Sequence, residues 1–141
     1  MKNWVLLVED SQDEILLARR AFAKAGLKEC LRVAENDRPP EAQLQDADGD
    51  TPALVLLDLQ MPGRDGLSVL RSLRAISTAA VVPIVILSSS DEPRDIADAY
   101  TAGANSYLRK PLDFDRFVQM VRDLHGYWIG HNTLPPERGA A

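Results

Sequence analysis

Runs of apolar residues, each ended by polar or turn-forming residues, recur along the chain at intervals that suit buried strands. The clearest run is Leu54–Leu57, which leads into Asp58 and then into the break formed by Pro62 and Gly63. A short, wholly apolar run of this kind is typical of a strand that is buried on both faces of a parallel sheet. Four further runs are predicted to be strands: Trp4–Val8, Cys30–Ala34, Val81–Leu87 and Ser106–Leu108.

Segments with apolar residues at helical spacing separate these strands. Five helices are predicted, beginning near residues 12, 41, 67, 93 and 114, and the second of them is expected to be short. Ser11 or Asp10 can cap the first helix, which Gly26 closes, and Asp113 can cap the last. Strands that alternate with helices indicate an α/β fold: a doubly wound, five-stranded parallel sheet with five helices, placed on both faces.

Composition narrows the class of protein without naming it. The chain has 141 residues, enough for one domain, and its 45% apolar and 26% charged content is that of a globular protein. A net charge of −5, with scattered basic residues, argues against nucleic-acid and membrane-surface binding. The N-terminal stretch becomes acidic at Glu9 and Asp10, too soon for a signal peptide, and no apolar run has membrane-spanning length. We therefore expect a cytoplasmic protein.

The single cysteine, Cys30, cannot form a disulfide within the chain. A reducing compartment is the simplest setting for such a protein. Because no histidine lies near it in the sequence, Cys30 is expected to be a small buried hydrophobic residue on the second strand rather than a reactive thiol.

Polar groups follow four of the five predicted strands. Glu9 and Asp10 come after the first strand, Asp58 after the third, Ser88 after the fourth, and Lys110 shortly after the fifth. The ends of the first and third strands flank the point where ligands bind in a doubly wound sheet. Three carboxylates gathered there would repel one another unless a cation joined them, and hard oxygen ligands favour Mg²⁺.

Each of these residues also has an ordinary interpretation on its own. Asp58 could form a turn, Ser88 could cap a helix, and Lys110 could be a solvated surface lysine. The acidic pair could merely complement a helix dipole. Taken together, however, these interpretations would require several unrelated residues to meet at one edge of the sheet by accident.

The chain resembles the receiver domain of two-component response regulators. The resemblance covers roughly residues 3–124 and rests on five short motifs in order, each at a strand end; the matching residues are Glu9-Asp10, Asp58 with Met61-Pro62 and Asp65-Gly66, Ser88, Ala102-Gly103-Ala104, and Lys110-Pro111. It implies a flavodoxin-like sheet of order 2-1-3-4-5. Residues 1–125 are accordingly assigned to the receiver domain, and residues 126–141 to a C-terminal extension.

The resemblance also implies a reaction. Asp58 would be the phosphoacceptor, whose carboxylate forms an acyl phosphate. Lys110 would supply a positive charge to a phosphoryl oxygen, and Ser88 would donate a hydroxyl hydrogen bond to another. Pro111 is expected to follow a cis peptide bond that directs Lys110 into the site. Mg²⁺ is the expected cofactor, and its ligands would be Glu9, Asp10, Asp58 and the backbone carbonyl of Gln60.

Further residues occupy positions that tune the family's response. In the family, a hydroxyl residue moves toward the phosphate and an aromatic residue on the last strand turns inward. Ser88 and Tyr107 occupy these two positions. Gln60 and Ser90, each two residues beyond a site residue, occupy positions that set the lifetime of the phosphoryl group. The family usually has Asp-Gly before its second helix, whereas this chain has Arg38-Pro39-Pro40, so a short or displaced helix is expected.

The C-terminal stretch carries more apolar groups around its helix than one domain needs. It resembles the ending of single-domain regulators that are paired with bacterial phytochrome kinases, many of which dimerise through it. A homodimer is therefore expected, although a tail that packs on its own domain is an alternative. The interface candidates are Met120, Leu124, Tyr127, Trp128, Ile129 and Leu134.

The sequence thus predicts a stand-alone receiver rather than an enzyme. It would take a phosphoryl group from a sensor histidine kinase, and a bacteriophytochrome is one candidate. A degenerate receiver that acts only as a binding module is an alternative. A phosphatase of the haloacid-dehalogenase type is less favoured, because such enzymes need a second acid where this chain has Gln60. A flavodoxin-like cofactor protein would need a phosphate-binding loop after the first strand.

Overall fold

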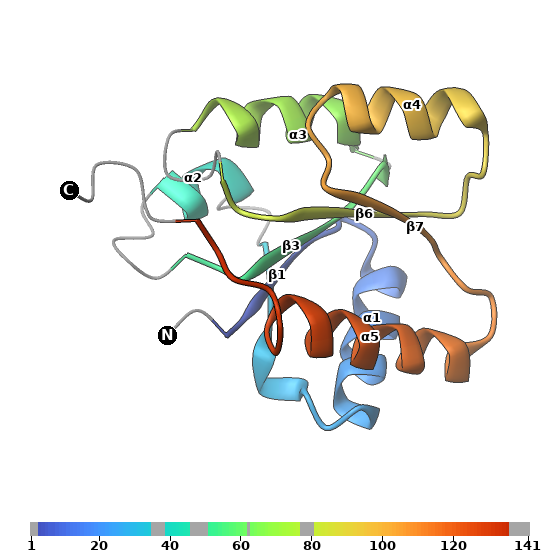
Figure 1. Ribbon diagram of the computed structural model, residues 1–141. Coiled ribbons are helices and arrows are strands. Elements are labelled where there is room, and N and C mark those ends of the chain that lie inside the picture. Colours follow the sequence, from blue (N-terminus) through green and yellow to red (C-terminus); the bar gives the residue numbers. More distant parts are fainter. Residues whose placement is uncertain (1–2, 35–38, 46–50, 62, 77–80, 136–141) are drawn as a thin grey trace.

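The computed structural model describes residues 3–34, 39–45, 51–61, 63–76 and 81–135. Its centre is a five-stranded sheet in which all neighbouring strands run parallel, in the order β2-β1-β3-β6-β7 (Figure 1). The strands are β1 (Val5–Val8), β2 (Leu31–Val33), β3 (Leu54–Asp58), β6 (Ile84–Ser88) and β7 (Ser106–Arg109). These five strands have the predicted order 2-1-3-4-5, which confirms the fold class.

A small antiparallel hairpin separates β3 from the helix that follows it. It consists of β4 (Gln60–Met61) and β5 (Arg64–Asp65) and lies outside the main sheet. The sequence analysis did not predict it, since two-residue strands leave no periodic pattern. The hairpin brings the residues after Asp58 back toward the edge of the sheet.

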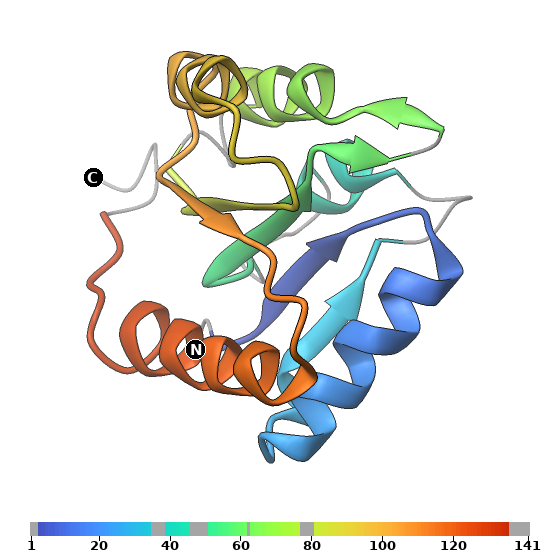
Figure 2. The ribbon, with the colours of Figure 1, turned by 90° about the vertical axis from the view of Figure 1, so that its right-hand side faces the viewer.

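Helices cover both faces of the sheet. They are α1 (Gln12–Lys24), α2 (Pro40–Gln45), α3 (Gly66–Ala75), α4 (Pro93–Thr101) and α5 (Phe114–Trp128), with a 3₁₀ turn, η1 (Lys28–Cys30). Helices α1 and α5 pack together on one face, and α3 and α4 lie on the other, with α2 beside α3 (Figures 1 and 2). The result is the three-layered arrangement that the alternation of strands and helices predicts, and α2 is short as expected.

The core is divided between the two faces because side chains alternate along each strand. On β1, Leu6 and Val8 pack against the α2–α4 side, whereas Val5 and Leu7 pack against α1 and α5. Every residue of β1, β3 and β6 is buried. These three strands carry the wholly apolar runs of the sequence, and they hold the ends of β1 and β3 rigidly at one edge.

Local capping fixes where the helices begin and end. The Ser11 side chain accepts a hydrogen bond from the Glu14 N–H, and the Asp113 side chain accepts one from the Asp115 N–H. Gly26, just beyond α1, has a φ of +79°, which favours glycine. The predicted caps at Ser11 and Asp113 and the predicted end at Gly26 are thus confirmed.

Several predicted boundaries were wrong or incomplete. Cys30 is half-buried in η1 rather than buried on a strand, because its N–H donates to the Leu27 carbonyl and is unavailable to the sheet. Helix α5 continues to Trp128, and the assignment of residues 126–141 to a C-terminal extension stays a prediction. Arg38, which precedes the two prolines at the start of the second helix, lies outside the described part of the chain. No helix within the described residues is long and apolar enough to cross a bilayer.

Candidate functional site

The register of the parallel strands brings the predicted site residues to one edge of the sheet. Val8 pairs with Leu57, so Glu9 follows β1 beside Asp58, the last residue of β3. Asp58 itself pairs with Leu87, which precedes Ser88 at the end of β6. The loops to α1, α4 and α5 leave this edge, on the right in Figure 1.

Lys110 reaches the site from the end of β7. Its backbone N–H donates to the Ser88 carbonyl at 2.8 Å, which extends the strand pairing by one residue. Its ammonium, Nζ, lies 3.3 Å from Asp58 Oδ2 and 3.0 Å from Glu14 Oε2. The Lys110 side chain is only 16% exposed, and the Asp58 side chain 7%. The structure thus joins a buried ammonium to the predicted phosphoacceptor.

The peptide bond between Lys110 and Pro111 is trans, which corrects the predicted cis-proline. All peptide bonds in the described ranges are trans. The trans form is favoured by about 0.5–1 kcal/mol even before proline. The Lys110 side chain still reaches Asp58 from this backbone, so the ion pair does not depend on a cis bond.

Glu14 is the site residue that the sequence analysis missed. It stands in the first turn of α1, where an acidic residue is expected merely to complement the helix dipole. Its contact with Lys110 joins residues 96 positions apart in the chain. The only available signal was its position one helical turn beyond Asp10, which places it near the same edge of the sheet.

Glu9 and Asp58 form a coupled pair of buried carboxyl groups. Burial, together with a hydrogen bond to Asp58, raises the pKa of Glu9 from 4.5 to about 8. Burial alone would also raise the pKa of Asp58, but hydrogen bonds from Glu9, from the Gln60 N–H and from Lys110 lower it. The two pKa values shift in opposite directions, which favours the proton on Glu9 and the negative charge on Asp58.

The electrostatics of Lys110 match this arrangement. Burial alone would lower the pKa of its ammonium, but the hydrogen bond to Glu14 and the charges of Asp58, Glu14 and Glu9 raise it above 10.5. Lys110 is therefore a permanent positive charge beside Asp58.

Asp10 offers an oxygen atom that the protein leaves without a hydrogen bond. Its Oδ2 accepts a hydrogen bond from the Gly63 N–H at 2.9 Å, whereas its Oδ1 is buried and has no hydrogen-bond partner among the described residues. A cavity of about 250 Å³ opens beside it, lined partly by Glu9, Asp10 and Met61. A buried carboxylate oxygen without a donor costs free energy unless a cation approaches it, so this donor set fits Mg²⁺.

Fewer carboxylates are available to a cation than the sequence predicts, because the Glu9 side chain already accepts backbone hydrogen bonds. Its Oε1 accepts hydrogen bonds from the Asp10 and Ser11 N–H groups. Across the described ranges, no three acidic, histidine or cysteine side chains form a group that could hold a metal ion. Glu9 is therefore a weaker cation ligand in this structure than the sequence predicts, and the Oδ1 of Asp10 is the carboxylate oxygen that lacks a hydrogen-bond donor among the described residues.

A hydrogen-bonded network links the end of β6 to β7 and α4. Ser88 is fully buried, and its Oγ accepts a hydrogen bond from the Ser90 N–H. The Tyr107 hydroxyl donates to the Ser90 carbonyl at 2.9 Å. The Ser90 hydroxyl donates to Asp95 on α4. Ser90, predicted to influence phosphoryl lifetime, therefore holds its side chain against α4.

Gln60, the other predicted lifetime residue, lies across the site entrance from the β6–α4 loop. Its side-chain oxygen accepts a hydrogen bond of 2.6 Å from the Ser89 hydroxyl, and its N–H donates to Asp58 Oδ1 at 2.9 Å. Gln60 therefore ties β4 to both the phosphoacceptor and the loop that carries Ser88.

The predicted interface residues divide into buried and exposed groups. Leu124 is 7% exposed and belongs to the core, which corrects its place as a surface candidate. Met120, Trp128 and Ile129 are half-buried against the same core, and Leu134 is half-buried. Tyr127 is 53% exposed. The stretch therefore packs largely on its own domain and leaves one aromatic side chain outward.

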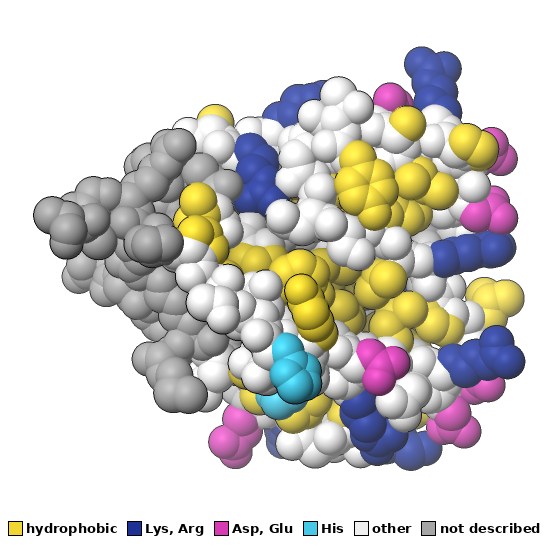
Figure 3. All heavy atoms as spheres, viewed as in Figure 1, with side chains coloured by type: hydrophobic (Ala, Val, Ile, Leu, Met, Phe, Trp, Pro, Cys, Tyr) yellow, Lys and Arg dark blue, Asp and Glu magenta, His cyan; other side chains and the backbone are white. Residues whose placement is uncertain are grey.

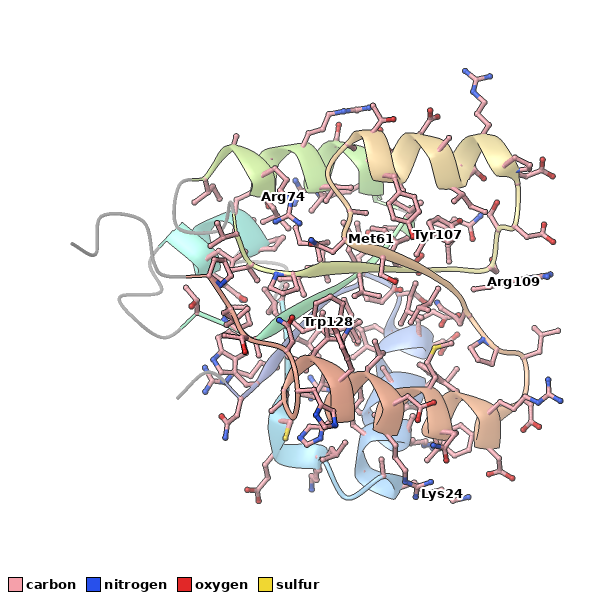
Figure 4. All side chains as sticks on the ribbon, in the orientation of Figure 1. Lys24, Met61, Arg74, Tyr107, Arg109 and Trp128 are labelled. Carbon is pink, nitrogen blue, oxygen red and sulfur yellow. The ribbon has the colours of Figure 1, made fainter. Side chains whose placement is uncertain are left out.

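A groove of about 610 Å³ lies between β7 and α5. Leu108, Met120, Leu124, Tyr127 and Trp128 supply its apolar lining. Apolar side chains gather on this face over β7, between α4 and α5 (Figure 3). Trp128 stands at the end of α5, and Tyr107 lies on β7 of the same face (Figure 4).

Arg74 forms hydrogen bonds to the segments that precede β6 and β7, on the face of the sheet opposite α1 and α5. From α3, its guanidinium donates to the carbonyl oxygens of Gly103 at 2.9 Å and Val82 at 2.7 Å, and to the Asn105 side chain (Figure 4). Burial lowers the pKa of Arg74. The sequence analysis gave Arg74 no role beyond the helix, since its acceptors are distant backbone atoms.

With this geometry in place, comparison with known proteins gives a clear result. Residues 5–122 match the family described as the response regulator receiver domain. The chain belongs to this family. Receiver domains are signalling modules of two-component systems, and the resemblance inferred from the sequence motifs is confirmed.

Individual relatives include phytochrome-associated regulators. The chain is 33% identical over 134 residues to the probable methanogenesis regulatory protein FilR2 of Methanothrix harundinacea, covering 93% of this chain and 86% of FilR2. The phosphorylated cyanobacterial phytochrome response regulator RcpA superposes with a TM-score of 0.79 at 26% identity, covering 96% of this chain and all of RcpA, 100%. The Mn²⁺-bound form of response regulator Rcp1, a Synechocystis protein, gives a TM-score of 0.73 at 25% identity, covering 95% and 99%.

Proposed function

We propose that this receiver domain accepts a phosphoryl group on Asp58 from a histidine kinase. One observation carries the proposal: the buried carboxylate of Asp58, whose pKa is lowered, lies 3.3 Å from the buried ammonium of Lys110. Phosphoryl transfer asks a protein mainly for positioning and for neutralisation of charge, and this site provides both.

The reaction forms one bond and breaks another. An oxygen of the Asp58 carboxylate attacks phosphorus while the P–N bond of the kinase's phosphohistidine breaks, and the electron pair of that bond stays on the imidazole. The Lys110 ammonium lies beside Asp58 Oδ2, and the Gln60 N–H donates a hydrogen bond of 2.9 Å to Asp58 Oδ1. Bound Mg²⁺, which Asp10 and Asp58 would hold, would supply further positive charge to the phosphoryl oxygens.

The acidic pair prepares Asp58 for this role. Because the opposite pKa shifts favour the proton on Glu9, Asp58 is free to act as the nucleophile. The bound cation would favour the ionised form of Glu9 and so displace that proton. Mg²⁺ is supported by the chemistry of the Asp10 oxygen and by the Mn²⁺-bound relative.

The signal would leave the site through the β6–α4 loop. A phosphoryl group on Asp58 offers new acceptors to the Ser88 hydroxyl, whose present partner is the Ser90 N–H. Any movement of this loop displaces Ser90, whose carbonyl accepts a hydrogen bond from Tyr107 and whose hydroxyl donates one to Asp95. We therefore expect the face made by α4, β7 and α5 to change on phosphorylation and to contact the next protein in the pathway.

The phosphodonor is proposed to be a protein, because two exposed leucines lie two residues beyond Glu14 and Lys110 in the chain. Leu112, two residues beyond Lys110, is fully exposed, and Leu16 on α1 is 47% exposed. Exposed leucines beside a reactive carboxylate suit a protein surface better than a small molecule. The likeness to RcpA supports a bacteriophytochrome as the kinase, which would place both proteins in the cytoplasm.

A homodimer is proposed through the groove and the C-terminal stretch. Tyr127 is the exposed aromatic residue on its rim, and it packs edge-to-face on Trp128 with ring centroids 4.9 Å apart. Tyr127→Ser should shift the protein toward monomer on a sizing column with light scattering. Leu16→Ser, which removes an exposed apolar residue from α1, is the control that should leave the assembly unchanged. Equal elution of wild type and Tyr127→Ser would exclude this interface.

The decisive experiment measures intact mass after incubation with acetyl phosphate and Mg²⁺. Wild type should gain one phosphoryl group, whereas Asp58→Asn should gain none under the same conditions. Glu41→Gln serves as a control, because this carboxylate pairs with Arg64 rather than with Lys110. Phosphorylation of Asp58→Asn at the wild-type level would remove Asp58 from its proposed role, and an unmodified wild type would favour a pure binding module.

A further inference from the structure

The ammonium of Lys110 has two carboxylate partners, and only Asp58 takes part in the reaction proposed above. Nζ lies closer to Glu14 Oε2, at 3.0 Å, than to Asp58 Oδ2, at 3.3 Å. The ammonium is mostly buried, so both interactions are screened less than those of a surface pair. Glu14 therefore neutralises part of the positive charge of Lys110 that would otherwise interact with the phosphoryl group.

Both ends of the Glu14–Lys110 pair are fixed by the backbone. The Glu14 N–H donates to the capping Ser11 side chain at the start of α1. The Lys110 N–H is bound to the Ser88 carbonyl at the end of β6. Because neither anchor involves Asp58, the two side chains remain within reach of each other when Asp58 is modified.

We propose that Glu14 is a positioning residue that competes with the phosphoryl group on Asp58 for the Lys110 ammonium and so limits how much phosphorylated protein accumulates. The inference rests on the proposed function and adds a residue to it. Phosphorylation replaces one carboxylate charge with a group that carries about two negative charges. The Lys110 ammonium must then interact with the phosphoryl group and with Glu14 at the same time, while the Glu14 carboxylate repels the added negative charge.

The test compares the ratio of phosphorylated to unphosphorylated protein at a fixed, subsaturating concentration of acetyl phosphate with Mg²⁺. In this reaction the P–O bond of acetyl phosphate breaks, acetate leaves with its electron pair, and an Asp58 O–P bond forms. Glu14→Gln keeps the size and an acceptor oxygen but removes the charge. Since the Glu14 side chain is 40% exposed, the ratio should rise about threefold to tenfold, and less at high salt.

Asp13→Asn is the matched control. Asp13 is exposed on the same helical turn, so the substitution changes the net charge of the protein equally. It should leave the ratio at the wild-type value, and both variants should unfold at the wild-type temperature. A rise in Asp13→Asn equal to that in Glu14→Gln would reduce the effect to net charge and overturn the role of Glu14.

Two outcomes separate this inference from the proposed function. If wild type gains no phosphoryl group on Asp58, the proposed function fails and the inference fails with it. If wild type is phosphorylated and Glu14→Gln shows the same ratio, only the competition by Glu14 is overturned. Glu14→Ala is a second variant for the case in which Glu14→Gln does not fold, and it should show the same rise; an unchanged or lower ratio would contradict the inference.

Discussion

The Tyr107 hydroxyl donates a hydrogen bond of 2.9 Å to the backbone carbonyl of Ser90, and this bond joins β7 to the loop that follows β6. The same loop carries Ser88, whose Oγ accepts from the Ser90 N–H. An aromatic side chain on the surface strand is thus connected to the phosphoacceptor edge through two hydrogen bonds at one residue. Ser88 and Tyr107, which are predicted to form a switch, thus both hydrogen-bond to Ser90, and the switch itself stays a prediction.

Tyr107→Phe should weaken this link while keeping the ring in place. Loss of one hydrogen bond between a side chain and the backbone costs about 1 kcal/mol of unfolding free energy, which urea denaturation can measure. Amide exchange of residues 89–92 should become faster in the unphosphorylated variant, because the loop loses its contact with β7. Tyr100→Phe on α4 is the control, since Tyr100 is 48% exposed. Unchanged exchange in Tyr107→Phe would contradict the link.

The metal-free protein should lose stability as the pH rises from 4.5 to 8. Between these values folded Glu9, with its pKa raised to about 8, keeps a proton that unfolded Glu9 releases. Raising the pH therefore favours unfolding, by up to about 1.4 kcal/mol per pH unit. The lowered pKa of Asp58 acts in a separate window, since the stability it adds is lost only as the pH falls below its ordinary value of 3.8.

Urea unfolding in the presence of a chelator, at several pH values, measures this dependence. Glu9→Gln removes the titrating group and should flatten the profile in the same range. A wild-type stability that rises or stays level between pH 5 and pH 8, on a scale of about 1 kcal/mol, would show that Glu9 is not protonated in the folded protein.

Mg²⁺ should stabilise the folded protein through Asp10. A ligand present at tenfold its dissociation constant adds about 1.4 kcal/mol to the unfolding free energy. Asp10→Asn should lose most of this increment, because the buried Oδ1 is the oxygen that lacks a protein partner. Thermal unfolding with and without Mg²⁺ measures the difference, and Asp13→Asn is the control that should respond as wild type does. An equal Mg²⁺ response in Asp10→Asn would place the ion elsewhere.

Arg74→Met should destabilise the fold without touching the site. The substitution removes charged hydrogen bonds to the Gly103 and Val82 carbonyls, each a partly buried acceptor, and should cost about 2–3 kcal/mol. Arg71→Met, on the same helix but exposed, should cost less than about 0.5 kcal/mol. Denaturant unfolding gives both values. Phosphorylation by acetyl phosphate should be retained in both variants, and its loss would indicate that Arg74 also shapes the site.

The sequence by itself indicated a parallel α/β sheet and the edge at which the chemistry lies, and the resemblance to receiver domains supplied the order of the strands. The apolar runs of β1, β3 and β6 are local signals, because a strand buried on both faces must be apolar at every position. Each run ends in a polar residue, and parallel strands bring their ends together, so the meeting of Glu9, Asp58 and Lys110 followed from the pattern.

Only the tertiary structure decided which side chains contact one another at that edge. No local sequence pattern predicts the features that depend on side-chain direction and burial. These are the Glu14–Lys110 pair, the trans bond before Pro111 and the raised pKa of Glu9. The position of Leu124 in the core likewise follows from how α5 packs on the sheet. Distances of a few ångströms between residues far apart in the chain arise from the packing of all layers at once, and they set the charges of the site.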